Sequence, residues 1–379
     1  MIRDGQGEMY GTTRGGGLAS CGDGSCGTVY KIDSSGNETV IFSFPGGNSG
    51  TNPIASVVRD AHGNLYGTTQ GNGVIDGASV VYKIDPKGQE TVLFEAGRIS
   101  QGCCLDSPVV LDPQGNVYGM SPYAGVPNCG WQSNGLGCGT LFKITPGGKF
   151  TVLHNFAGTD GMQPEGGLVM DKQGNLYGSA NFGGIKSCKN PGYGYWEPGC
   201  GTIYKLDTNG KFSVLYTFTG KADGSFPLGL IIDDDANLYG LTEWGGDDKR
   251  YYNHLYGYGT VFELSASGKF TTLFTFTPKT TINNYYASHL LRDAKGNLYG
   301  LQQMNNCAKG GGCLFRVDPK GKYTDLYDFE YLGEGPDGWY PMGVVFGSDK
   351  DMYGTMEIGG SENGDCEDGC GTVFHLAFP

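Results

Sequence analysis

A Tyr-Gly pair recurs seven times along the chain and constrains the fold more than any other feature of the sequence. Each pair follows a turn and a Leu, Met or Val. The seven tyrosines are Tyr10, Tyr66, Tyr118, Tyr177, Tyr239, Tyr299 and Tyr353. A second motif, Gly-Thr-Val-Tyr-Lys at 27–31, returns after each later pair. Its versions end at Lys83, Lys143, Lys205, Glu263, Arg316 and His375. This regularity predicts seven similar structural units.

Each unit has the pattern of four short antiparallel strands. In the fourth copy, strands are expected over 167–171, 175–179, 201–206 and 212–216. These segments alternate in hydropathy and are rich in β-branched and aromatic residues. The first two and the last two are joined by tight turns in which Gly supplies a positive φ. A third motif, as at 39–44, marks the fourth strand in six copies but not in the seventh.

Four-stranded units of about 40–60 residues are typical of β-propeller blades. Parallel β-helix repeats are shorter, and one isolated unit could not bury both faces of its sheet. Gly makes up 69 of the 379 residues, and no amphipathic run of helix-forming residues occurs. We therefore predict an all-β, seven-bladed β-propeller, with four antiparallel strands per blade and a last blade that lacks its outer strand. The expected single domain spans 1–379, with blades starting near residues 2, 56, 108, 167, 229, 289 and 343.

The charge balance excludes several classes of partner. The net charge is −13 and the isoelectric point is about 4.8. Phosphate backbones and anionic membranes need clustered Lys and Arg, so neither nucleic acid nor a membrane surface is expected as a partner. No stretch approaches the roughly 18 apolar residues of a membrane span.

Twelve cysteines fall into pairs that are close in sequence. The pairs are Cys21 and Cys26, Cys103 and Cys104, Cys129 and Cys138, Cys188 and Cys200, Cys307 and Cys313, and Cys366 and Cys370. No spacing typical of a zinc site occurs. Short disulfides that close loops, in an oxidising compartment, are therefore expected; a cytosolic protein with reduced thiols is the alternative. The adjacent pair either forms a strained ring or stays reduced. Because the expected disulfides need an oxidising compartment, we expect a secreted or surface protein. No signal peptide is visible, so we infer that the export signal has been removed.

The repeated motifs also carry a resemblance. The segment 63–69, Gly-Asn-Leu-Tyr-Gly-Thr-Thr, followed by Gly-Thr-Val-Tyr-Lys and Thr-Val-Leu-Phe, resembles the GloVer tandem-repeat family. These are extracellular proteins with varied surface anchors. The resemblance covers nearly the whole chain and implies a secreted or surface propeller, but it implies no activity. The first copy departs from the motif because Glu8 stands in place of Asn. The seventh copy departs because its turn reads Gly-Ser-Asp-Lys-Asp at 347–351.

The long loops between the second and third strands are where function is expected. They differ in every blade, whereas the turns at the other end are short and alike. Aromatic rings can stack on sugar rings, so we predict a carbohydrate-binding surface. The alternative is that these rings fill the interior of their loops. The predicted substrate-binding residues are Trp131, Trp196, Trp244, Trp339, Tyr195, Tyr252, Tyr286 and Arg14.

Four ionisable residues that break the repeat symmetry are the candidate catalytic groups: Glu243, Glu357, His254 and His289. Two carboxylates could act as acid and base in glycoside hydrolysis. A His could instead abstract a proton from a uronate, as in a polysaccharide lyase. The alternative for each carboxylate is a solvated loop charge. No cofactor is expected beyond a structural Ca²⁺ at the acidic loop 365–368, a weak signal without the spacing of an EF-hand.

Two functions are compatible with the sequence. The first is a secreted or cell-surface propeller that binds a polysaccharide, with cleavage left open. The polysaccharide is expected to be neutral because an acidic protein repels anionic polymers. The second is a structural or adhesive surface protein that self-assembles, or binds a protein partner, through the open edge of blade seven.

Overall fold

The computed structural model describes residues 1–17, 26–71, 79–96, 105–127, 129, 137–185, 188, 199–246, 257–277, 290–302, 307–330, 338–348, 351–360 and 371–378. Within these ranges the chain forms β-strands and one 3-10 turn, η1 (Gly47–Ser49), with no α-helix. No described helix is long and apolar enough to cross a membrane.

Seven small antiparallel sheets follow one another along the chain, which is the arrangement of a seven-bladed β-propeller. The predicted fold class is thus confirmed. The chain divides into two compact units, of which the first comprises Met1–Ser187 and Trp196–Thr217, and the second comprises Cys188–Tyr195 and Phe218–Pro379. The expectation of a single domain stays a prediction.

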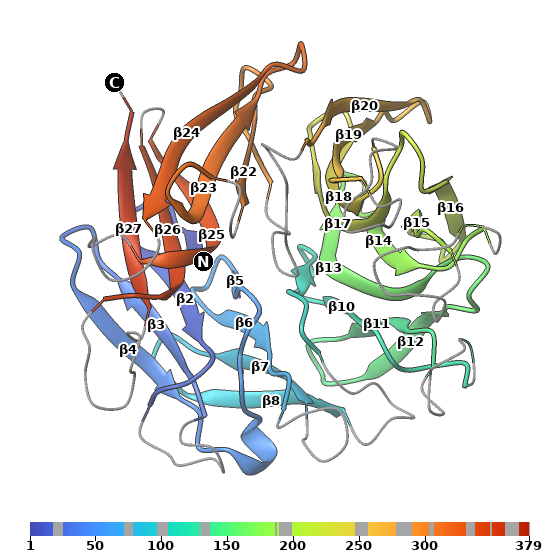
Figure 1. Cartoon of the computed structure of the whole chain (residues 1–379). Helices are drawn as coiled ribbons and strands as arrows, with labels where there is room; N and C mark the ends of the chain where they lie inside the picture. Colours follow the sequence, from blue (N-terminus) through green and yellow to red (C-terminus); the bar gives the residue numbers. More distant parts are fainter. Residues whose placement is uncertain are drawn as a thin grey trace. The chain divides into compact units, whose positions relative to one another are not determined.

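The first unit carries blades one to four, and each blade is a four-stranded meander (Figure 1). Their strands are β1 (Ile2–Arg3), β2 (Met9–Thr13), β3 (Thr28–Ile32) and β4 (Glu38–Ser43); β5 (Val58–Arg59), β6 (Leu65–Thr68), β7 (Ser79–Ile84) and β8 (Glu90–Ala96); β9 (Val110–Leu111), β10 (Val117–Ser121), β11 (Thr140–Ile144) and β12 (Phe150–Asn155); and β13 (Met162–Met170), β14 (Leu176–Phe182), β15 (Thr202–Leu206) and β16 (Phe212–Thr217).

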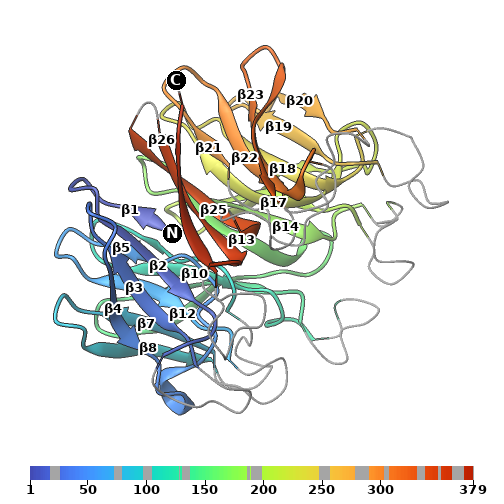
Figure 2. The same ribbon diagram turned by 60° about the vertical axis from the view of Figure 1, so that its left-hand side comes forward.

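The second unit carries blades five to seven (Figure 2). Their strands are β17 (Ser225–Ile232), β18 (Leu238–Trp244), β19 (Thr260–Leu264) and β20 (Phe270–Thr275); β21 (Leu291–Arg292), β22 (Leu298–Gln302), β23 (Gly310–Val317) and β24 (Tyr323–Glu330); and β25 (Trp339–Ser348), β26 (Asp351–Ile358) and β27 (Thr372–Ala377). The last blade has three strands, as predicted.

The two repeated motifs fit against each other inside each blade. In blade four, the ring of Tyr204 on the third strand is fully buried and lies over Gly178 on the second strand. A Cβ at Gly178 would collide with the Tyr204 hydroxyl, and Gly67 stands in the same relation to Tyr82. The glycine of the Tyr-Gly pair is therefore needed for space, because the aromatic residue of the second motif occupies the volume above it.

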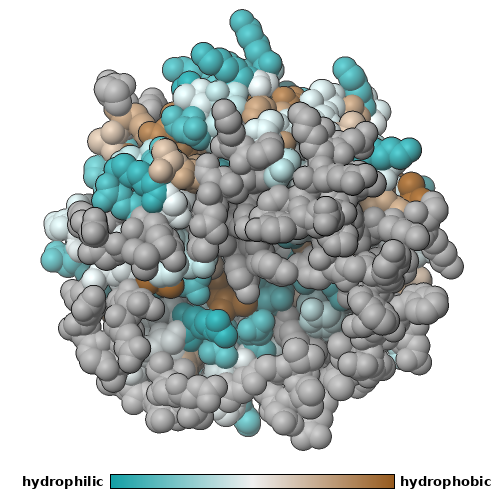
Figure 3. Space-filling view, in the orientation of Figure 1, coloured by the Kyte–Doolittle hydropathy of each residue, from teal (hydrophilic) through white to brown (hydrophobic). Residues whose placement is uncertain are grey.

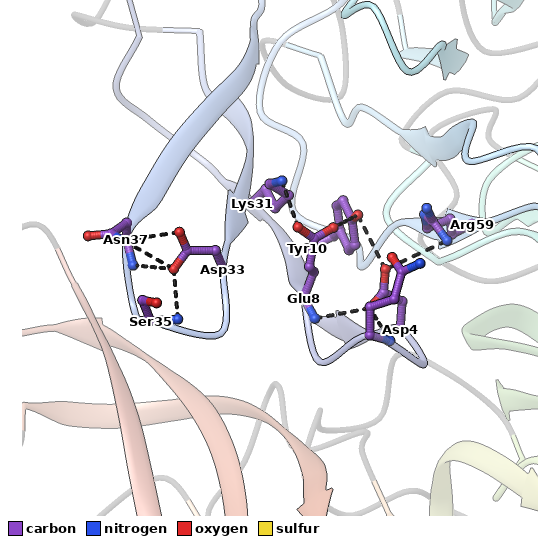
Figure 4. Close-up of polar contacts among 9 residues, drawn as sticks. Asp4, Glu8, Tyr10, Lys31, Asp33, Ser35, Asn37 and Arg59 are labelled. Atoms are coloured by element: carbon purple, nitrogen blue, oxygen red, sulfur yellow. Dashed lines mark hydrogen bonds and ion pairs between the residues drawn. The ribbon is translucent and has the colours of Figure 1, made fainter.

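The tyrosine of the pair is held by the turn that precedes it. Asp171 accepts hydrogen bonds from the backbone N–H groups of Gln173 and Asn175, at 3.0 and 2.8 Å, through Oδ1. Its Oδ2 accepts from the Asn175 side chain at 2.7 Å and from the Tyr177 hydroxyl at 2.9 Å. Figure 4 shows related contacts in blade one, where Asp4 faces Tyr10. The Asp-x-x-Gly-Asn-Leu-Tyr segment is thus one hydrogen-bonded unit.

Replacing Asp171 with Asn should lower the free energy of unfolding at pH 7 by about 1.5–3 kcal/mol, because the turn loses a charged acceptor. Partial burial alone raises the pKa of Asp171, but the hydrogen bonds from Asn175, Tyr177 and Gln173 outweigh it and lower the pKa. This contribution is present above about pH 4, the ordinary Asp pKa, and is lost as the pH falls through the lower folded value. Urea unfolding at pH 7 and pH 3 measures it. The exposed Asp235→Asn is the control, and equal effects of the two changes would contradict the prediction.

Every four-stranded blade also has a β-bulge in its outer strand. The pairing of the third and fourth strands shifts by one residue at the same place in all six of these blades. The extra residues are Ile41, Leu93, Leu153, Leu215, Leu273 and Leu326. Bulges twist an edge strand and discourage pairing with another chain, so these six outer edges are protected.

Hydrophobic side chains of the described part form separate patches among hydrophilic ones on the face seen in Figure 3. On the outer strands, Val40 and Val152 are 51% and 42% exposed. Single apolar residues scattered in this way are ordinary on the surface of a folded domain.

Candidate functional site

The two candidate carboxylates lie at the end of the blades where the second strand leads into the long loop. Glu243, in β18, is only 2% exposed, although the sequence allowed a solvated loop charge there. Glu357, in β26, is exposed. No described contact joins the two residues, and their catalytic role stays a prediction.

Most of the other predicted site residues lie outside the described residues. These are His254, His289, Trp131, Trp196, Tyr195, Tyr252 and Tyr286. Arg14 is described, and it is exposed in the bend that follows β2. The acidic loop 365–368 also lies outside the described part of the chain.

Two predicted aromatic residues are placed at the same end of their blades. Trp244 ends β18, where it pairs with Ser225 at the start of β17. Trp339 begins β25, where it pairs with Ile358 at the end of β26. Both side chains are partly exposed. Each thus lies where the first strand of its blade begins and the second ends.

Trp339 forms an aromatic pair with its neighbour Tyr340. The ring centroids are 4.7 Å apart and the planes are tilted by 31°. The backbone of Tyr340 has a φ of 60°, which is rare for a bulky residue and costs about 1–3 kcal/mol. The strain accompanies an aromatic pair at the loop end of blade seven.

The same strain recurs in or before the first strand of other blades. Asn52, Gln163 and Phe226 have φ values of 57°, 54° and 59°, and each precedes a proline, as Tyr340 does. The N–H of Gln163 donates to the carbonyl of Cys138 at 2.8 Å, and that of Asn52 donates to Cys26 in the same way. These bonds tie the segment that opens each blade to the end of the preceding blade's loop. The strain therefore belongs to the scaffold, and the side chain varies from blade to blade.

One buried Asn and two half-buried acids at this end of the first unit were not predicted. The Asn181 amide donates to the Glu165 carboxylate at 2.7 Å, and Asn181 is 1% exposed. Burial raises the pKa of Asp106 to about 6, although Ser107 donates a hydrogen bond to it. Asp106 and Glu165 replace apolar residues near the start of the first strand. An acid at a position that is apolar in the other copies was the available signal in the sequence. It was missed because the repeat emphasises the residues that the copies share.

The predicted disulfides are confirmed where they are described. Cys129 is bonded to Cys138, and Cys307 to Cys313. Cys26, Cys188 and Cys200 are also disulfide-bonded. Cys21, Cys103, Cys104, Cys366 and Cys370 lie outside the described residues. Short closures of this kind restrict the unfolded chain by about 2–3 kcal/mol each.

The Cys307–Cys313 bridge lies in a polar environment. The Oε1 atom of the buried Gln302 is 3.7 Å from the Cys307 sulfur and 3.5 Å from the Cys313 sulfur. The carboxylate of Asp328 lies close to both sulfurs. Because the sulfurs are bonded to each other, they are not thiolates, and the group does not form a metal site in this state.

A cavity of about 160 Å³ lies in the first unit, lined by Phe94, Ala124, Gly125, Thr140, Phe150, Val152 and Asn155. Among the described residues, its lining contains no carboxylate and no His. It therefore lacks the acid and base groups that hydrolysis or elimination would need.

Comparison with known proteins places the chain in a family. Its sequence matches the Gloeobacter/Verrucomicrobia repeat over residues 1–190 and 132–330. No curated protein sequence matches it. A gluconolactonase from Xanthomonas campestris is 14% identical, with 84% of this chain and 83% of that chain aligned and a TM-score of 0.44. A luciferin-regenerating enzyme is 15% identical, with 85% and 90% aligned and a TM-score of 0.48. At these identities and TM-scores, neither likeness carries an argument about this chain. The repeat matches span most of the sequence, and the chain therefore belongs to the Gloeobacter/Verrucomicrobia repeat family.

Proposed function

We propose that this protein is a secreted or cell-surface β-propeller that binds a neutral polysaccharide at the loop end of its blades. The observation that carries the proposal is the Trp339–Tyr340 pair, two partly exposed rings at the start of β25. Flat aromatic surfaces that combine an apolar face with a polar edge suit sugar rings, whose two faces are apolar and whose rim is hydroxylated.

The backbone and the charge support this choice. The φ of 60° at Tyr340 is the scaffold geometry that Gln163 and Phe226 share, so the Tyr340 ring is carried on a fixed backbone. The net charge of −13 disfavours uronate polymers, so the proposed ligand is neutral. The disulfides suit an oxidising, extracellular compartment.

The test is electrophoresis of the protein through gels that contain β-glucan, xylan, galactomannan or a polyuronate. At least one neutral polymer should retard the protein, and Trp339→Ala should weaken the retardation about tenfold or more, a loss of about 1.4 kcal/mol. Val152→Ala, on an outer strand, is the control and should migrate like the parent protein. Equal retardation of Trp339→Ala and the parent, or retardation by the polyuronate alone, would contradict the proposal.

Catalysis is examined with the same polymers. Hydrated oligosaccharides detected by mass spectrometry would identify a hydrolase, and unsaturated ends a lyase. Glu243→Gln and Glu357→Gln would then test the two carboxylates. Substitutions of His254 and His289 would test the two histidines. Retardation without products would leave a binding protein.

A second candidate function is assembly or adhesion through blade seven. The observation that favours it is the three-stranded sheet of the described residues, in which β27 pairs on one side with β26. An edge strand carries backbone donors and acceptors that can extend a sheet into another chain.

A further inference from the structure

Blade six departs from its siblings at the start of the second motif, in its third strand. In five blades this motif begins with Gly-Thr, but in blade six it begins with Gly312-Cys313. The five threonines are Thr28, Thr140, Thr202, Thr260 and Thr372. The substitution places a sulfur where the repeat has a hydroxyl group.

The neighbours of Cys313 in the sheet are changed as well. In blade five, the row of paired residues across the second, third and fourth strands consists of Thr242, Thr260 and Thr275. In blade six, the same row across β22, β23 and β24 (Figure 1) consists of Gln302, Cys313 and Asp328. Three hydroxyl groups are thus replaced by an amide, a cysteine sulfur and a carboxylate.

A second sulfur completes a cluster around this row. Cys307, from the loop between β22 and β23, is bonded to Cys313. The two sulfurs and a carboxylate oxygen of Asp328 all lie within 4.8 Å of one another. The Gln302 Oε1 atom is 3.7 Å from the Cys307 sulfur and 3.5 Å from the Cys313 sulfur. Four groups that can ligate a metal ion are therefore collected at one end of blade six.

The orientation of the buried Gln302 side chain is set by Tyr323. The Tyr323 hydroxyl donates its proton to the carboxylate of Asp325, so it accepts a hydrogen bond from Gln302. Gln302 donates this bond through Nε2, at 3.4 Å. The amide oxygen is thereby turned toward the two sulfurs, where it can serve as a ligand.

The distances in the cluster suit a tetrahedral ion. With Zn–S bonds of about 2.3 Å and Zn–O bonds of about 2.1 Å, a sulfur and an oxygen ligand lie about 3.6 Å apart. The two distances from the Gln302 oxygen to the sulfurs lie on either side of this value. The Asp328 carboxylate is also positioned, because its Oδ1 accepts a hydrogen bond from the Ala308 N–H at 3.2 Å, next to Cys307. Two sulfurs and two oxygens would fill the four positions.

We propose that blade six holds a metal site that opens when the Cys307–Cys313 bridge is reduced. The two thiolates, the Asp328 carboxylate and the Gln302 carbonyl oxygen then bind one thiophilic divalent cation such as Zn²⁺. Reduction by a dithiol breaks the S–S bond and oxidises the reductant to a cyclic disulfide, and the two protons pass to the cysteine sulfurs. Binding of the cation displaces these two protons. The site goes beyond the proposed glycan binding and is independent of it.

The Cys129–Cys138 bridge of blade three offers a comparison within the same chain. The row of paired residues beside it consists of Ser121, Thr140 and Asn155, without a carboxylate. The Cys129 sulfur lies 3.9 Å from the backbone carbonyl oxygen of Phe156. Reduction of this bridge would give two thiols without the carboxylate that blade six supplies, so it serves as the matched control.

The test is a Co²⁺ titration of the full chain, reduced with a dithiol and desalted without oxygen. The reduced protein should show the thiolate-to-cobalt charge-transfer absorption of a tetrahedral site, which Zn²⁺ should remove and the oxidised protein should lack. Cys313→Thr, which restores the residue of five siblings, should abolish this site. Asp328→Thr should weaken Co²⁺ binding about tenfold or more, because it removes a ligand. Cys129→Ser combined with Cys138→Ser should bind like the parent protein.

Alkylation by iodoacetamide, mapped by mass spectrometry of peptides, locates the ion. Zn²⁺ should slow the alkylation of Cys307 and Cys313 in the reduced parent protein and leave that of Cys129 and Cys138 unchanged. This arm decides the question even where a variant fails to fold. No charge-transfer absorption in the reduced protein, equal affinities of the parent and Asp328→Thr, or equal protection of both pairs would overturn the proposal.

Discussion

Replacing Phe156 with alanine is expected to lower the free energy of unfolding by about 3–5 kcal/mol, the usual cost of removing a fully buried aromatic ring. Phe156 is 0% exposed. Its ring centroid lies 5.1 Å from that of Tyr204, 5.6 Å from Phe212 and 5.0 Å from His154. The substitution would remove one side of this cluster and leave a cavity between the third blade and the fourth. The loss is large against the 5–15 kcal/mol that stabilises a typical domain.

Urea unfolding followed by far-UV circular dichroism and tyrosine fluorescence measures the loss. The control is Val152→Ala in the same strand β12, where the side chain is 42% exposed. Surface changes of this kind shift stability by about 0.5 kcal/mol or less. A Phe156→Ala protein as stable as the control would mean that the rings between blades are not what holds neighbouring blades together.

The fold was predictable because its determinants repeat. The Tyr-Gly pair, the second motif and the outer-strand motif each recur in register, so random matches in one copy are corrected by the others. The physical link between the motifs was not predictable. Nothing in the sequence says that Gly178 is required by the ring of Tyr204, or that Tyr177 is bonded to Asp171. The first contact joins residues that the long loop separates, and the second depends on the geometry of the turn at 171–177.

The extent of the inner strands was harder to predict. In blade four the first strand was expected to start at 167, but β13 starts at Met162. Pro164 and the pair Gly166-Gly167 resemble a turn, and Gln163 has a positive φ. A bulge between Glu165 and Val169 lets the strand continue past these residues. Strand propensity is judged over several residues and does not register a single bulge. The predicted start of this strand was therefore too late.

The candidate site was less predictable than the fold, because a site is built from positions where the repeat is broken. Glu243 was identified in this way, but its burial to 2% exposure was not foreseen. Asp106 and Glu165 were missed since an acid in a strand otherwise apolar looks like noise in one copy. Loop residues such as Trp131 and His254 have no equivalents in other blades, so the repeat gives them no register.

Raising the pH through the range of tyrosine ionisation is expected to unfold the protein cooperatively between about pH 10 and 12. Burial raises the pKa of Tyr10, Tyr30, Tyr66 and Tyr239 to about 12 in the folded protein. In an unfolded chain these phenols lose their protons near pH 10. A folded pKa above the unfolded value means that the neutral phenols stabilise the fold fully below pH 10. That stabilisation is lost as the pH rises toward 12, because the unfolded chain then releases protons that the folded chain keeps.

The measurement is phenolate absorbance at 295 nm and far-UV circular dichroism on the same samples. Both signals should change together and more steeply than one proton allows, because several tyrosines ionise in one step. Tyr204→Phe is the informative variant, since burial raises the Tyr204 pKa strongly and its hydroxyl has no hydrogen-bond partner among the described residues. The variant keeps the ring and removes the ionisable group, so its unfolding midpoint should move to higher pH without loss of stability at pH 7. Gradual phenolate formation near pH 10 with unchanged dichroism would show that the tyrosines titrate as if exposed.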